Sequence, residues 1–132
     1  MDFSSLILME RDNETGFVTK EIGSFEVGEG AKYIKSFYVQ GEDVFIKFDT
    51  YDDVDEWQYT AIYDLFDYTL FEKNDMDIED VEDTFNPTFL IKFNYDDNFE
   101  YLKGKLDLSI DLIEQALNNV FKEIEGKEEE YN

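Results

Sequence analysis

The sequence predicts an α+β fold: an antiparallel sheet of four or five strands packed against a long C-terminal helix and a shorter middle helix. Three patterns predict this class. Apolar and polar side chains alternate through the first 50 residues, whereas apolar side chains recur at steps of three and four in 57–72 and from residue 99 to about 125. The 132 residues fit one domain without an internal linker, so we expect a single domain over 1–132 with a frayed tail at 126–132.

Strand signals fill the first part of the chain. Turn residues at Asp12–Gly16 separate two alternating segments and indicate a hairpin, and Gln40–Asp43 makes a second tight connection. Such short connections favour strands that follow one another as an antiparallel meander. The predicted strands are 3–10, 17–22, 24–27, 33–39 and 44–49.

The middle of the chain is less regular. Acidic residues at the start of 57–72 suit the first turn of a helix, because the helix dipole favours negative charge there. Residues 54–63 also alternate, so a further strand stays open as the alternative for that stretch. Residues 74–82 are predicted to be an acidic connection with at most one short helical turn, whereas 89–95, which follows the only proline, is the clearest strand.

The C-terminal helix has recognisable ends. Asn98 is a suitable N-cap, and Gly126 is a suitable stop. Its apolar stripe could cover the sheet or pair with a second copy of the chain, and we favour the sheet because the sheet needs a cover. Monomer and homodimer both remain possible.

Composition narrows the chemistry. The chain has no cysteine and no histidine, which excludes disulfides, thiolate zinc sites and the commonest general base. Residues 1–10 lack the basic start and the cleavage site of a secretory signal, and no apolar run is long enough to span a membrane. We therefore expect a cytoplasmic protein that does not bind membranes.

Negative charge is concentrated in one part of the sequence. The net charge is −23, and the segment 49–83 holds fourteen acids against Lys73 alone, which gives −13. The first 41 residues hold seven acids and four bases, which gives −3. Such a distribution makes direct nucleic-acid binding improbable and favours a basic protein partner.

This acidic segment is also rich in aromatic residues, which suit a protein interface where they are exposed. We predict a non-catalytic protein-binding or regulatory module, with no cofactor, no metal ligand and no catalytic residue. The candidate partner surface consists of Asp49, Asp52, Asp53, Asp55, Glu56, Trp57, Asp75, Asp77, Glu79 and Asp80.

The acids have three alternative interpretations. A calcium loop starting at Asp75 has Asp80 where the EF-hand needs glycine and Asn86 where it needs glutamate. A carboxylate-dependent hydrolase is a weaker reading, because 34 acids always supply some plausible pair. A nucleic-acid mimic that inhibits a DNA- or RNA-binding protein remains the first alternative, because a basic groove accepts either polyanion.

Five short stretches carry a family resemblance: Thr15–Phe17, Glu26–Gly30, Asp55–Tyr59, Asn86–Thr88 and Gly126–Tyr131. They resemble a family of small acidic uncharacterised proteins from anaerobic, spore-forming, low-GC Gram-positive bacteria. The resemblance implies a housekeeping protein of unknown function, which counts mildly against a phage inhibitor that mimics nucleic acid. It carries over no site residue.

Overall fold

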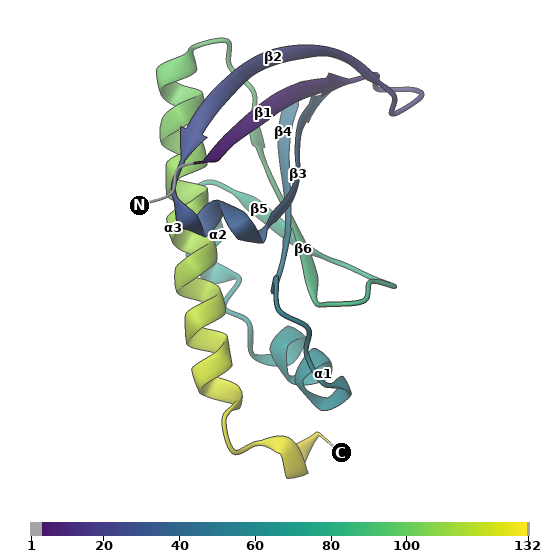
Figure 1. The fold of residues 1–132 in the computed structure, drawn as a ribbon, viewed down its shortest axis with the longest axis vertical. Helices are drawn as coiled ribbons and strands as arrows, with labels where there is room; N and C mark the ends of the chain where they lie inside the picture. The colour runs from purple at the N-terminus through teal and green to yellow at the C-terminus, as the bar shows by residue number, and fades with distance from the viewer. Residues whose placement is uncertain (1–3, 132) are drawn as a thin grey trace.

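A computed structural model describes residues 4–131, in which helices cover one face of a curved six-stranded sheet (Figure 1). Phe3 of the predicted strand 3–10 and Asn132 of the predicted tail lie outside these residues. The strands are β1 (Ser4–Arg11), β2 (Val18–Val27), β3 (Ile34–Gln40), β4 (Asp43–Asp49), β5 (Asp77–Val81) and β6 (Thr88–Asn94). The helices are α1 (Glu56–Leu65), α2 (Thr69–Glu72) and α3 (Phe99–Ile124), with short 3-10 turns η1 (Glu29–Tyr33) and η2 (Glu128–Glu130).

The sheet order is β2-β1-β3-β4-β6-β5. The α+β class and the long C-terminal helix are confirmed. The prediction of four or five antiparallel strands is only roughly right, because the sheet has six strands. In addition, β1 and β3 run parallel, with Met9 opposite Tyr38. A meander assumes that each strand pairs with the one before it. Here η1 separates β2 from β3, so β3 enters the sheet beside β1 instead.

The sixth strand is β5, in the stretch predicted to be an acidic connection. Its only apolar residues are Ile78 and Val81, and the other three are acids. β5 lies at an edge of the sheet and is half exposed, so it does not need the apolar alternation of a central strand. The three acids of β5 leave too few apolar residues for the alternation that predicts a strand.

The middle helix is broken in two. Residues 56–65 are helical as predicted, which decides the ambiguity of 54–63 against a strand, and the backbone N–H of Asp55 donates to the Gln58 side chain at 2.8 Å at the start of α1. The backbone becomes extended at Phe66 (ψ 136°), so the predicted helix over 57–72 is wrong between α1 and α2. Phe66 is buried, and its ring stacks on Phe89 at a centroid distance of 4.1 Å.

Helix α3 follows the prediction closely. The Asn98 side chain accepts hydrogen bonds from the backbone N–H groups of Glu100 and Tyr101, at 2.9 and 3.2 Å. Its apolar stripe is buried in the same core as the sheet residues Ile46 and Ile91. In the tail, where fraying was expected, η2 forms and the Tyr131 hydroxyl donates to the Asp64 carboxylate at 2.5 Å.

Two features of the core govern its stability. Stacked phenylalanines join the sheet to the helices: Phe48 lies 5.2 Å from Phe89 and 6.1 Å from Phe71, centroid to centroid. Gly30 of η1 is buried beside α3, where a Cβ would come within 2.6 Å of the Ile110 Cγ2 atom.

None of the helices within residues 4–131 combines the length and the hydropathy that a membrane span requires.

Candidate protein-binding surface

The predicted surface residues fall on two segments. One is the connection from β4 into α1, where the acids are exposed apart from the half-buried Asp49, and where Trp57 is half-buried in the first turn of α1. The other is the exposed acidic stretch at and just before the edge strand β5. The first segment holds Asp49, Asp52, Asp53, Asp55, Glu56 and Trp57, and the second holds Asp75, Asp77, Glu79 and Asp80.

Asn86 joins these two parts of the molecule. It lies in the connection from β5 to β6, and its side chain donates to the Asp53 carboxylate at 3.1 Å and accepts from the backbone N–H of Val54 at 3.3 Å. The residue is only 8% exposed. The loop before α1 and the loop after β5 are therefore in direct contact, which the sequence did not show.

Strand β5 divides its acids between the two faces of the sheet. Asp77 and Glu79 lie opposite Lys92 and Leu90, on the face without helices, which we call the open face. Asp80 lies on the helix-covered face, where the Tyr68 hydroxyl donates to its carboxylate at 2.5 Å. The predicted acids of β5 thus do not form a single patch.

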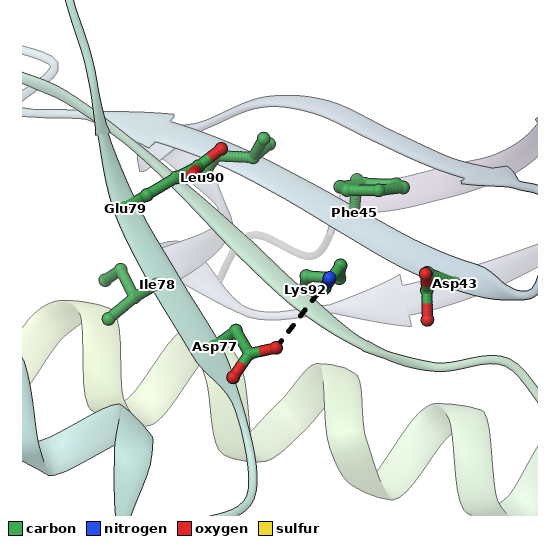
Figure 2. A pocket seen from close by; sticks show the side chains of 7 residues that line it. All are labelled: Asp43, Phe45, Asp77, Ile78, Glu79, Leu90 and Lys92. Carbon is green, nitrogen blue, oxygen red and sulfur yellow. Dashed lines mark ion pairs between the residues drawn. The ribbon is translucent and has the colours of Figure 1, made fainter.

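The open face has a pocket of about 350 Å³ beside β5, shown in Figure 2. The Lys92 Nζ atom points toward Asp77 and lies 3.8 Å from its carboxylate. Asp43 and Phe45 of β4 were not predicted as site residues. The alternation along β4 could have indicated them, because Val44, Ile46 and Phe48 face the core and the residues between them face the other side of the sheet. The lining residues are Asp43, Phe45, Asp77, Ile78, Glu79, Leu90 and Lys92.

A second pocket, of about 580 Å³, lies on the helix-covered side of β5. Two tyrosines of α1 form its aromatic wall, and the Tyr59 hydroxyl lies 3.3 Å from the Thr84 hydroxyl. Neither tyrosine was predicted as a site residue. The lining residues are Tyr59, Tyr63, Asp80, Glu82, Asp83 and Thr84, which include three acids and no base.

Most carboxylates of the acidic segment 49–83 lack a basic neighbour. Among the residues that the structure describes, two of the fourteen acids in 49–83 have a lysine within 4 Å: Asp49 with Lys35 at 3.7 Å, and Asp77 with Lys92 at 3.8 Å. Exposed pairs of this kind are weak. The negative charge of this segment is therefore mostly uncompensated.

In the described chain, no three His, Cys, Asp or Glu side chains gather closely enough to hold a metal ion.

Three tyrosines keep their hydroxyl proton to a higher pH than a free tyrosine does. Burial is the main cause that raises the pKa of Tyr68 well above 10.0, and the hydrogen bond to Asp80 is the second cause. Burial also raises the pKa of Tyr63. The hydrogen bond to Asp64 raises the pKa of Tyr131 to about 12.

These shifts predict a loss of stability at high pH. A raised folded-state pKa contributes stability that is fully present below the unfolded value near 10.0 and disappears as the pH rises through the folded value. We expect tyrosinate absorbance to develop at higher pH in the folded protein than in the chain unfolded in denaturant. In Tyr131→Phe, the step at about pH 12 should be missing. Superimposable titrations of the folded and unfolded chains would contradict the prediction.

The fold and this surface define a small, strongly acidic α+β domain with a six-stranded mixed sheet. The chain belongs to a family of unknown function (DUF6762), which matches residues 1–132. No curated protein and no solved structure matches it. Membership of an uncharacterised family, as the resemblance implied, is confirmed, and it assigns no activity; the Gram-positive origin stays a prediction.

Proposed function

We propose that this protein is a non-catalytic, cytoplasmic binding or regulatory module that engages a basic protein partner through its acidic and aromatic middle segment. The observation that carries the proposal is the uncompensated charge of the surface segments 49–56 and 75–83: among the described residues, all of their acids except Asp49 and Asp77 lack a lysine within 4 Å. A surface of one sign accelerates encounter with a partner of the other sign and disfavours partners of like sign.

Aromatic side chains that are exposed or line a pocket support the same interpretation. Phe85, in the loop between β5 and β6, is 82% exposed, and Tyr59 and Tyr63 line the nearby pocket. Aromatic side chains that lose water on binding commonly supply much of the affinity of a protein interface. Charge would steer the partner to these two segments, and the aromatic rings would hold it there.

The test compares two charge-matched variants. One replaces Asp52, Glu56, Glu79 and Glu82 by their amides, and the other replaces Glu123, Glu128, Glu129 and Glu130, which are also exposed but lie at the end of α3 and in η2. The partner is first captured from the native host with the unaltered protein and then purified. We expect the first variant to bind the partner roughly tenfold more weakly, because four exposed ion pairs with the partner are lost. The second variant should bind within about twofold of the parent.

Salt and nucleic acid complete the experiment. Binding should weaken steadily as salt is raised, since exposed charges are screened. Equal losses in the two variants, or a partner without a basic surface, would contradict the proposal. A partner that normally binds nucleic acid, and that DNA displaces from this protein, would favour mimicry instead.

A further inference from the structure

We infer that the free edge of β5 accepts an extended, basic segment of the partner as a seventh strand of the sheet. This inference rests on the proposed function and specifies how the partner is bound. Three observations support it: the unpaired edge, the two pockets that flank it, and the sign of the charge on both.

The edge itself is open. β5 ends the sheet order and pairs over five positions with β6, from Asp77 opposite Lys92 to Val81 opposite Thr88. Within the described chain, the backbone of residues 77–80 makes hydrogen bonds only in that ladder. A sheet edge with free N–H and C=O groups is a template for another strand.

The two pockets lie on opposite faces of the same strand. The open-face pocket includes Asp77 and Glu79, and the helix-side pocket includes Asp80 and Glu82. Successive side chains of a strand point to opposite faces of a sheet. A strand added to β5 would therefore direct alternate side chains toward the two pockets, as in known cases of strand addition.

The lining chemistry fits lysine and arginine on both faces. On the open face, Phe45 and Leu90 offer apolar surface to an aliphatic stem while Asp43 and Glu79 face the charged head. On the other face, the tyrosine rings together with the nearby acids suit a cation. Charge complementarity thus selects a basic segment at successive positions.

The other edge of the sheet is a poorer candidate. At the end of β2, the Lys103 ammonium group already donates to the Glu26 carbonyl. Phe99 lies over Gly23 so closely that an added Cβ would meet its ring at 2.9 Å. A second copy of the chain is also a poor occupant of the β5 edge, because pairing two β5 strands would place like charges together.

The probe is a blocked heptapeptide, Thr-Lys-Lys-Val-Lys-Lys-Thr, together with two derivatives that carry N-methyl groups on alternate backbone nitrogens, odd in one and even in the other. All three have the same charge. Of the two derivatives, the one whose methyl groups face β5 should bind about tenfold more weakly than the parent peptide, because its ladder hydrogen bonds are lost. The other, whose methyl groups face solvent, should stay within about threefold.

Variants of the protein locate the contact. Asp77→Asn with Glu79→Gln should weaken binding of the parent peptide about fivefold, whereas Glu128→Gln with Glu129→Gln removes the same charge from η2 and should change it less than twofold. Amide hydrogen exchange at residues 77–81 should slow when the parent peptide binds.

The outcomes separate this inference from the proposed function. If both methylated peptides bind as well as the parent, strand addition is overturned, while weaker binding to the Asp77 and Glu79 variant would still support an acidic contact surface. If the parent peptide does not bind at low salt, strand addition is likewise overturned, and the proposed function is judged by its own variants and captured partner.

Discussion

Replacing Phe89 with alanine is expected to lower the free energy of unfolding by roughly 3–5 kcal/mol, the usual cost of deleting a buried aromatic ring. Phe89 is fully buried at the centre of the stacked rings, with Phe66 at 4.1 Å and Phe48 at 5.2 Å between centroids. Removing the Phe89 ring leaves a cavity between Phe66 and Phe48, which the packed sheet and helices can fill only in part. Chemical denaturation of the parent and Phe89→Ala proteins measures the difference.

Phe85 provides the matched control, four residues earlier. It is 82% exposed, so Phe85→Ala should change the free energy of unfolding by no more than about 0.5 kcal/mol. Similar losses in the two variants would show that the aromatic cluster is not where the stability lies.

Replacing Gly30 with alanine is the second large effect expected. A Cβ there would come within 2.1 Å of the Glu114 Oε1 atom and 2.6 Å of the Ile110 Cγ2 atom. The carboxylate can swing away, but Ile110 is 5% exposed and held in the core. We expect a loss of about 1–3 kcal/mol in unfolding free energy, as for other overpacked sites, because η1 and α3 must move apart.

Gly28, two residues earlier, tests that explanation. No atom lies within 4 Å of the position its Cβ would take, and its backbone conformation is extended at φ −90° and ψ −167°. Gly28→Ala should therefore be neutral or slightly stabilising in thermal and chemical unfolding. A loss equal to that of Gly30→Ala would point to the chain's need for glycine in this turn rather than to crowding against α3.

Local patterns predicted the elements that carry their own signals. The alternation of Phe89, Ile91 and Phe93 specified β6, and Asn98 with the stripe behind it specified α3, because each of these signals lies within one element. The break at Phe66 could not be predicted, since the helical spacing continues through it. What overrides the spacing is tertiary: the ring of Phe66 stacks on a strand that comes more than twenty residues later.

Pairing between strands was less predictable for a related reason. The parallel contact of β1 with β3 covers Met9 to Arg11 and depends on where η1 directs the chain. β5 was missed because an edge strand of acids has almost no apolar pattern.

The sequence shows where the acids lie along the chain but not how they are arranged in space. Fourteen acids lie in 49–83, and in the structure two of them have a lysine within 4 Å. The sequence could not show that Asn86 joins the loops before α1 and after β5. It also could not show that Asp80 and Asp77 lie on opposite faces of β5, or that Asp43 and Phe45 of β4 line the pocket beside Asp77. Each of these depends on strand register or on a contact distant in sequence.

The position of α3 after all six strands in the sequence has a consequence for biosynthesis. The sheet residues that α3 covers, such as Ile46 and Ile91, are made well before the helix that shields them from water. Until residues 99–124 leave the ribosome, the nascent sheet has an unshielded apolar side, a state that favours aggregation. The surplus of negative charge, most of it already synthesised by then, keeps unfinished chains apart through mutual repulsion.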